Sequence, residues 1–287
     1  RSTHSSVVLS SVGSRLPTEA RRRRKSAATS HPRSSNQREI DGTGGAVMTS
    51  YPIEPPLCRW ELPDLSRAGD DQELVGIGAD LAPGTMLAGY RSGLFPMGVR
   101  MPDGEEAMGW WSPNPRGILR PEAVHLSRSL RRSMLRFEFS VDAAFDEVVA
   151  ACADPSRPHG WIDGGFPDAY RALHDLGWAH SVEVWRSEGL GTRELVGGLF
   201  GVQVGGLFAA ESKFHRETDA SKAAVVQLCR LLDADGAGAG RLIDVQWATP
   251  HLQTLGVTSV PRAHYLSLIR QALAMPAGLR PDLEADS

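Results

Sequence analysis

Three strand-like segments in a row, joined by short turns, limit most strongly what this chain can fold into. Residues 180–186, 194–204 and 207–213 have the length and apolar patterning of strands. Gly205 and Gly206 separate the last two segments. Two glycines suit the tight turn of a hairpin because glycine adopts positive φ without steric cost. The sequence therefore predicts an antiparallel meander.

Helical periodicity appears on both sides of this meander. The first expected helix starts at about Pro83, with Asp80 near its start and Gly93 as its stop. Two more are expected over 140–153 and over 166–176, the latter with Gly177 as its stop. The last two are expected from a cap near Asp219 to residue 232 and over 262–274. One further strand is expected at 241–247. Strands that are grouped before a helix–strand–helix sequence are typical of an α+β fold.

A proline-rich connector suggests two folded parts. The segment 108–116, MGWWSPNPR, contains Pro113 and Pro115, which favour an extended chain over a helix. We therefore expect a small N-terminal α/β domain over 48–116, a larger domain over 117–280 and a short C-terminal tail over 281–287.

The first 47 residues differ in composition from the rest. Ser, Arg and Thr dominate, Arg21 to Lys25 are five consecutive positive charges, and the segment lacks the apolar residues needed for a core, so we expect disorder. Met48 follows directly, and both an upstream extension of the true start and a basic arm for RNA remain open. This tail holds 9 of the 31 Lys and Arg and 3 of the 34 Asp and Glu, which leaves 22 against 31 beyond it. The folded part is acidic at −9, so any contact with nucleic acid needs a local basic patch.

The chain has the composition of an ordinary globular protein. No apolar run approaches the roughly 18 to 20 residues that a membrane span needs, so a soluble protein is expected. Cys58, Cys152 and Cys229 are odd in number and widely spaced, without a CxxC pair or a cluster of histidines. This spacing argues against a disulfide framework and against a zinc site. We expect reduced, mostly buried thiols in the cytoplasm and no bound metal.

Two polar positions on a predicted strand are the first candidates for chemistry. Along RLIDVQ, the period of two places Asp244 and Gln246 on one face of the strand and Ile243 and Val245 on the other. An exposed strand face is the alternative, because alternating polarity usually reports solvent.

A second polar pair falls at the end of another predicted strand. Glu211 and Ser212 lie in ESKFHRETDASK, just before the predicted helix from 219, and strand ends commonly present site residues. Taken alone, Glu211 would equally suit a surface carboxylate.

Basic and aromatic residues offer two further surfaces. On a helix over 125–136, Arg128, Arg132 and Arg136 would be spaced at i, i+4 and i+8 with Arg131 adjacent, which predicts either a stripe that binds nucleic acid or a solvated helix face. Among the aromatic residues, Trp161, Tyr90 and Tyr170 could stack on a base, although core packing is the more common role for any one of them.

One glycine pattern resembles a phosphate-binding loop, but its position argues against that role. Arg186-x-x-Gly189-x-Gly191 matches the loop that cradles pyrophosphate in CoA-dependent acetyltransferases. Such a loop should lead from a strand into a helix, where free backbone N–H groups favour an anion, whereas this one joins two predicted strands. We do not expect CoA to bind here.

A series of motifs resembles the leucyl/phenylalanyl-tRNA–protein transferases. In chain order they are GADLAPGTMLAGYRSGLFP, WWSPNPRGIL, HLSRSL, AHSVEVW, LVGGLFG, AAESKF, DASK, LIDVQ and HLQTLGV, covering about residues 74–270. The resemblance implies a small N-terminal domain beside an acetyltransferase-like (GNAT-like) domain that uses aminoacyl-tRNA in place of acyl-CoA. It also implies transfer of Leu, Phe or sometimes Met to a protein whose first residue is Arg or Lys, which marks that protein for degradation in the N-degron pathway. No cofactor is implied, and we expect a cytoplasmic monomer.

By similarity, the candidate residues take roles in this reaction. The catalytic pair is Asp244 and Gln246, with Glu211 and Ser212 in the acceptor site; Trp161, Tyr90 and Tyr170 hold the terminal adenosine; Leu199, Lys213, Val225 and Leu228 line the aminoacyl pocket; and Arg128, Arg131, Arg132 and Arg136 form the tRNA patch. Asp244 is expected to orient the incoming amine and accept a proton. Gln246, whose amide is too weak a base, is expected to position that amine.

Two departures from the family pattern concern the donor. The family commonly has Trp where this chain has Met97, and Met where it has Lys213, so the preference for Leu and Phe is open. A CoA-dependent N-acyltransferase and a non-catalytic RNA-binding protein remain alternative functions.

Overall fold

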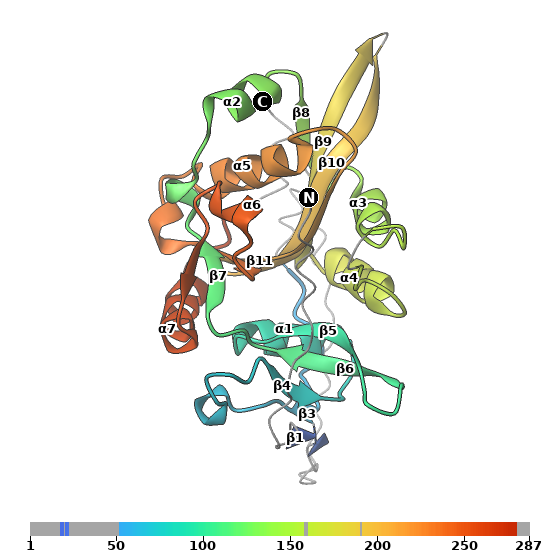
Figure 1. Cartoon of the computed structure of the whole chain (residues 1–287), viewed down its shortest axis with the longest axis vertical. Coiled ribbons are helices and arrows are strands. Elements are labelled where there is room, and N and C mark those ends of the chain that lie inside the picture. The colour runs from blue at the N-terminus through green and yellow to red at the C-terminus, as the bar shows by residue number, and fades with distance from the viewer. Residues whose placement is uncertain (1–17, 20, 23–51, 158–159, 190, 280–287) are drawn as a thin grey trace, which may run out of the picture.

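The computed structural model describes residues 18–19, 21–22, 52–157, 160–189 and 191–279. Within them a four-stranded sheet lies at one end of the molecule, and a seven-stranded sheet with its helices forms the rest (Figure 1). The architecture is mixed α and β, as the sequence predicts. In the described residues no helix combines the length and apolarity that crossing a membrane requires.

The smaller sheet has the strand order β1-β4-β6-β5. Its strands are β1 (Thr18–Glu19), β4 (Leu74–Ile77), β6 (Glu106–Trp111) and β5 (Phe95–Arg100), and a two-stranded sheet joins β2 (Arg21–Arg22) to β3 (Trp60–Glu61). Most of the segment 1–47 lies outside the described residues, so its predicted disorder stays a prediction. The predicted connector over 108–116 is strand as far as Trp111, and Pro113 and Pro115 then lead into the larger sheet.

Helix α1 (Pro83–Arg91) begins and ends as the sequence predicts. The carboxylate of Asp80 accepts hydrogen bonds from the backbone N of Ala82 at 3.1 Å and from the hydroxyl of Thr85 at 2.7 Å, which satisfies donors at the start of the helix. Gly93, with φ of 83°, follows the last turn. The chain then enters β5.

The larger sheet has the order β13-β7-β12-β11-β10-β9-β8. Its strands are β13 (Thr258–Val260), β7 (Arg116–Leu119), β12 (Leu242–Gln246), β11 (Leu207–His215), β10 (Thr192–Val204), β9 (Ala179–Gly189) and β8 (Glu138–Val141). The predicted meander is confirmed as β9, β10 and β11, and Gly205 makes the predicted turn with φ of 58°. One parallel pair, β11 with β12, interrupts the otherwise antiparallel order.

Helices cover both faces of this sheet. They are α2 (Arg128–Met134), α3 (Phe145–Cys152), α4 (Phe166–Asp175), α5 (Ala220–Leu232), α6 (Pro250–Gln253) and α7 (Arg262–Leu273), with short 3₁₀ turns at Leu65–Arg67, Pro121–Ala123 and Gly238–Gly240. Apolar side chains of α3 and α4 share one core cluster, and those of α5 belong to another on the opposite face. The buried side chains of Met86, Leu87 and Tyr90 on α1 join the first cluster.

The helix predicted over 140–153 starts later than expected. Ser140 and Val141 belong to β8, which pairs with β9, and Asp142 has φ of 55°, which a right-handed α-helix does not accommodate. Long-range pairing thus overrides the local helical spacing, and α3 begins at Phe145. The predicted helices over 166–176, 219–232 and 262–274 are confirmed as α4, α5 and α7.

The predicted cap of α5 differs in detail. Asp219 does occupy the position before the helix, but with φ of 69°, and its side chain makes no capping hydrogen bond. Its carboxylate instead accepts from the hydroxyl of Ser133 at 2.8 Å, which ties α5 to the end of α2.

Candidate active site

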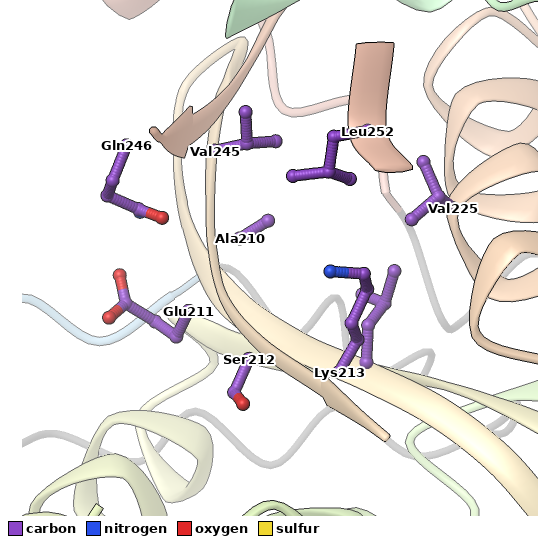
Figure 2. Close-up of a pocket in the computed structure, with 9 residues that line it drawn as sticks. Ala210, Glu211, Ser212, Lys213, Val225, Val245, Gln246 and Leu252 are labelled. Carbon is purple, nitrogen blue, oxygen red and sulfur yellow. The ribbon is translucent and has the colours of Figure 1, made fainter. Parts of the chain in front are cut away.

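A cavity lies where two parallel strands separate. The pairing of β11 with β12 runs from Leu207 opposite Leu242 to Ala209 opposite Asp244 and ends there. The cavity beyond this point holds about 100 Å³. It is lined by Leu199, Ala210, Glu211, Ser212, Lys213, Val225, Val245, Gln246 and Leu252 (Figure 2). The carboxyl ends of adjacent parallel strands thus frame the site.

A bulge on β11 turns Glu211 into this cavity. Phe200 of β10 pairs with Ser212 and Gly201 pairs with Ala210, which leaves Glu211 as an extra residue on β11. Gly201 permits the close approach, because a Cβ there would lie 2.2 Å from the backbone oxygen of Ala209. The bulge explains why consecutive residues of β11 line the cavity, whereas a regular strand would contribute alternate ones.

A second bulge lies at the same level on β12. Asp244 pairs with Ile118 and Gln246 pairs with Gly117, so Val245 is the extra residue. Gly117 is again needed, since a Cβ would lie 2.6 Å from the backbone N of Ala248. Gln246 has φ of 58°, an uncommon conformation for a residue with a side chain. The predicted alternation is therefore wrong at this point: Val245 and Gln246 both line the cavity, and Asp244 does not.

Glu211 is a buried carboxyl group held by a phenol. The hydroxyl of Tyr170 donates to its Oε2 at 2.7 Å, and the hydroxyl of Tyr90 lies 3.4 Å from that of Tyr170. Its Oε1 has no hydrogen-bond partner among the described residues. Burial raises the pKa of Glu211 to about 7, against the lowering effect of the hydrogen bond from Tyr170. The group therefore changes charge near neutral pH.

Asp244 is enclosed by partners that hold it in place. The guanidinium of Arg116 donates to both of its oxygens, at 2.8 and 2.6 Å, and the hydroxyl of Tyr265 donates at 2.7 Å. Its Oδ1 also accepts from the backbone N of Gln246 at 2.9 Å. Asp244 is 1% exposed and Arg116 is fully buried. A carboxylate with these bonds orients the turn at Gln246 and is not open to an incoming amine.

The side chain of Gln246 is fixed between the two strands. With the amide turned to the orientation opposite to that in Figure 2, which satisfies both of its ends, the amide nitrogen donates to the backbone oxygens of Val245 and Ala210, both at 3.0 Å. Figure 2 shows the carboxylate of Glu211 pointing toward this amide, with the hydroxyl of Ser212 turned away from it. The polar side of the cavity is therefore formed by Glu211 and Gln246.

Lys213 introduces a cation on the apolar side of the cavity. Its ammonium lies near Ala210 and Leu252 in Figure 2, and no carboxylate of the described residues pairs with it. Burial lowers the pKa of Lys213, and the charge of Arg157 lowers it further.

The predicted aminoacyl pocket is largely brought together. Leu199, Lys213 and Val225 line the cavity, whereas Leu228 of α5 is fully buried in the core and does not. Sequence reasoning missed Ala210, Val245 and Leu252, which complete the wall. Leu252 falls in the HLQTLGV motif, which is the one signal that could have pointed to it. Met97, predicted to lie near the donor, is in β5 and does not line the cavity.

The three aromatic residues predicted to hold the adenosine differ in exposure. Tyr90 and Tyr170 are 2% and 0% exposed, so neither ring offers a face for stacking, and the predicted contact with an adenosine does not fit them. They support Glu211 instead. Trp161 is half-buried, with its ring edge-on to Phe166 at 5.3 Å between ring centroids, and remains a candidate.

The basic stripe is exposed but shorter than predicted. Ser127 caps α2 by accepting from the backbone N of Leu130, and the helix ends at Met134. The predicted arginines are all exposed: Arg128, Arg131, Arg132 and Arg136. Arg136 lies beyond the helix, 4.0 Å from Glu217, so the regular spacing breaks before it.

Two other features bear on possible ligands. Gly189 ends β9 and Thr192 begins β10, so the glycine pattern lies in a hairpin, as predicted, and no helix follows it. No group of three or more His, Cys, Asp or Glu side chains in the described residues is arranged to hold a metal ion. The cysteines are free thiols, of which Cys152 and Cys229 are buried and Cys58 is half-buried.

Comparison with known proteins gives one family for most of the described residues. Residues 118–270 match the family model described as leucyl/phenylalanyl-tRNA protein transferase, and residues 79–114 match the model of its N-terminal domain. Among solved structures, a conserved protein of unknown function from Bacteroides thetaiotaomicron covers 70% of this chain and 67% of its own at 11% identity, and its TM-score of 0.32 is too low to bear on the fold.

Curated relatives agree with the family models. The leucyl/phenylalanyl-tRNA–protein transferase of Tolumonas auensis is 45% identical over 69% of this chain and 81% of its own. The proteins of the same name from Oleidesulfovibrio alaskensis and Aeromonas hydrophila are 44% and 40% identical, over 75% and 78% of this chain and 86% and 92% of their own. Identity at this level over most of both chains means that this chain belongs to the leucyl/phenylalanyl-tRNA–protein transferase family.

Proposed function

We propose that the cavity between β11 and β12 is the site at which this enzyme moves an aminoacyl group from tRNA to the N-terminus of a protein. The donors are Leu and Phe, with Met as a further candidate, and the acceptors begin with Arg or Lys. The observation that carries the proposal is the division of the cavity, because Glu211 and Gln246 face each other on one side and Leu199, Val225 and Leu252 form an apolar wall on the other.

The apolar wall suits the side chain of the donor. Burying a Leu or Phe side chain is favourable by about 1.5–3 kcal/mol, which is sufficient to favour such donors over polar ones. Trp161 is the candidate for stacking on the terminal adenosine. The exposed arginines of α2 and Arg136 are the candidate contacts for the tRNA backbone, and a local patch is needed because the folded part is acidic.

Glu211 is our candidate for the group that accepts the proton. The α-amine of the acceptor has a pKa of about 7.7 to 8.0, close to the pKa of about 7 for Glu211, so proton transfer between them is nearly balanced. The amine nitrogen attacks the carbonyl carbon of the ester, and the bond from that carbon to the 3′ oxygen of the tRNA breaks. Glu211 takes the proton from the amine nitrogen and passes it to the departing 3′ oxygen, which leaves the carboxylate ready for the next transfer.

Asp244 then has a positioning role, in place of the direct contact with the amine expected from the sequence. Asp244 accepts a hydrogen bond from the backbone N of Gln246 and so fixes the position of the Gln246 side-chain amide. Because the amide nitrogen of Gln246 is held by two backbone oxygens, its carbonyl oxygen is the atom left to accept a hydrogen bond from the amine. The carboxylate of Glu211 also favours a positively charged first residue, which fits an acceptor that begins with Arg or Lys.

The acetyltransferase-like assignment of the larger domain is part of the proposal. It is supported by a meander followed by a strand that pairs in parallel and then diverges, with the cavity at the divergence. The division at about residue 116 is supported by the change from the smaller sheet to the larger between β6 and β7. We further propose that the enzyme acts as a monomer in the cytoplasm and that the transferred residue marks proteins for degradation.

A transfer assay tests the function. The protein is mixed with tRNAs carrying labelled Leu, Phe, Met or Ala, and with peptides that begin with Lys, Arg or Ala. We expect label on the Lys and Arg peptides, from Leu and Phe above all, and none with the Glu211→Ala variant, which should still bind charged tRNA. Acetyl transfer from acetyl-CoA without tRNA, or RNA binding without any transfer, would overturn the proposal in favour of the alternative functions.

A further inference from the structure

We propose that Lys213 biases the donor pocket toward aromatic aminoacyl groups and against aliphatic ones, an inference that rests on the proposed function. Its chemical basis is an ammonium group placed inside a cavity whose other walls are apolar where the donor side chain would lie. Phe and Leu would then be distinguished by the charge of one side chain, and not by size alone.

The position of Lys213 follows from the strand pairing. On β11 it lies opposite Leu199 of β10, which lines the same cavity. Its side chain extends across the cavity, and Figure 2 shows the ammonium close to the apolar side chains of Ala210 and Leu252. Its stem and its charge therefore both reach the space that a donor side chain would fill.

The ammonium has no counter-ion in the described residues. The near charged group on the neighbouring loop is itself a cation, Arg157, whose guanidinium donates to the backbone oxygens of Lys213 and Cys152 at 2.7 and 2.6 Å. The lowered pKa of Lys213 agrees with this setting, because burial and a like charge both disfavour an ammonium. A donor side chain that fills this cavity would therefore lie directly against the ammonium.

The identity of the donor decides which group then faces the ammonium. The methyl groups of Leu leave the ammonium without a partner, which is unfavourable for a partly buried charge. The face of a Phe ring carries negative charge density and attracts a cation, and this attraction is stronger when the cation has lost water. An acidic donor is disfavoured because the carboxylate of Glu211 lines the same cavity. Among Leu, Phe and Met, Phe is therefore the donor whose side chain attracts the ammonium of Lys213.

The experiment compares donors in the intact enzyme and in Lys213→Met, which keeps an unbranched stem of similar length and removes the charge. Transfer to an Arg peptide is measured from Phe-tRNA and Leu-tRNA, and from tRNA carrying increasingly fluorinated Phe, since fluorine withdraws charge from the ring face. We expect Lys213→Met to lower the ratio of kcat/KM for Phe over Leu by about 3- to 30-fold, the range that corresponds to about 0.7 to 2 kcal/mol of cation–π attraction. Fluorination should lower transfer stepwise in the original enzyme and have little effect in the variant.

Lys222→Met is the matched control. Lys222 lies on α5 outside the cavity, 3.9 Å from Asp219, and its replacement should leave the ratio and the fluorine series unchanged. A thermal melt of each variant verifies that it is folded. Active enzyme with the same Phe to Leu ratio before and after Lys213→Met, or with a flat fluorine series, overturns the inference alone. Absence of transfer from every donor overturns the proposed function and the inference together.

Discussion

At the scale of single residues, the charge of Glu211 is the property that the reaction would use. Its carboxyl group must be ionised to take a proton, and because its pKa is raised to about 7, the ionised fraction falls as the pH falls through 7. A carboxyl group at its ordinary pKa would already be ionised at pH 6 and would give no such dependence. The pH profile of transfer therefore tests the role of Glu211.

We expect kcat to rise between about pH 6 and pH 8 and Glu211→Gln to lower it by roughly 10²- to 10⁴-fold, the usual contribution of a general base. Gln keeps a side-chain oxygen that can accept from Tyr170, so folding should be preserved. The measurement is single-turnover transfer from preformed Phe-tRNA across that range. The acceptor amine also titrates, so the step that belongs to Glu211 is the one that disappears in Glu211→Gln. An identical profile in the variant would exclude Glu211 as the base.

A second residue-scale prediction concerns the pair of Asp244 and Arg116. Asp244→Asn leaves the buried guanidinium of Arg116 without its counter-charge, and breaking a buried ion pair from one side typically costs about 3 to 5 kcal/mol of unfolding free energy. Tyr265→Phe removes the hydrogen bond to Asp244 at 2.7 Å and a long one from Arg116 at 3.5 Å but no charge, and should cost about 0.5 to 1.5 kcal/mol. Denaturant unfolding of the two variants gives the comparison. Equal stability of Asp244→Asn and the unaltered protein would contradict it.

At the scale of elements, glycines decide how closely the strands and turns approach their neighbours. Gly205, at the β10–β11 turn, has φ of 58°, and a Cβ would lie 2.7 Å from the backbone oxygen of Leu273 at the end of α7. Gly191, at the β9–β10 turn, has φ of 80° but open space around it. A substitution at Gly191 therefore introduces backbone strain alone, whereas one at Gly205 introduces backbone strain and a steric clash.

Gly191→Ala should lose only the preference for left-handed backbone, about 1 to 2 kcal/mol. Gly205→Ala should lose more, because the hairpin or the end of α7 must also shift. Thermal unfolding of the two variants side by side measures the difference. A smaller loss at Gly205 than at Gly191 would mean that the end of α7 moves freely.

The same elements show where periodicity is a poor guide. The rule of alternating faces correctly predicts ordinary strand segments, but it fails at Glu211 and Val245, where each strand holds one extra residue. A bulge depends on how two strands are paired, and residues far apart in sequence decide the pairing. The glycines opposite the bulges, Gly201 and Gly117, fall in the LVGGLFG and WWSPNPRGIL motifs, but a glycine in a strand is not by itself evidence of a bulge.

At the scale of the whole molecule, helix α2, which carries Arg128, Arg131 and Arg132, lies at the end opposite the smaller sheet (Figure 1). Because phosphate contacts release counter-ions, binding of tRNA should weaken steeply with salt. We expect Arg131→Ala with Arg132→Ala to reduce the slope of log affinity against log salt by about two, one for each lost contact. Filter binding of charged tRNA between low and physiological salt measures this slope.

The control for this prediction removes the same amount of charge elsewhere. Arg67 and Arg100 are exposed residues far from α2 in the sequence, in the 3₁₀ turn at Leu65–Arg67 and in β5 of the smaller sheet. Their joint replacement by Ala should leave the slope almost unchanged. If both double variants lowered the slope equally, the tRNA would be attracted by overall charge and not by a patch on α2.

The sequence by itself determined the order of α1, α4, α5 and α7 and of strands β9 to β12, the turn at Gly205 and the family to which the chain belongs. These features follow from short-range patterns, such as the helical period of α4 and α5, a pair of glycines between apolar runs, and a series of motifs in fixed order. It also brought Glu211, Gln246, Leu199 and Val225 into one site, since the resemblance names residues independently of their distance in sequence.

Only the tertiary structure decided how these residues act together. Asp244 was expected to face the substrate, but Arg116, 128 positions earlier in the chain, and Tyr265 enclose it. Tyr90 and Tyr170 were expected to stack on a base, but the packing of α1 against α4 buries them beneath Glu211. Folding alone brings together the neighbours that determine burial, the pKa of a carboxyl group and the direction of a side chain at a bulge. These properties therefore cannot be predicted from the local sequence.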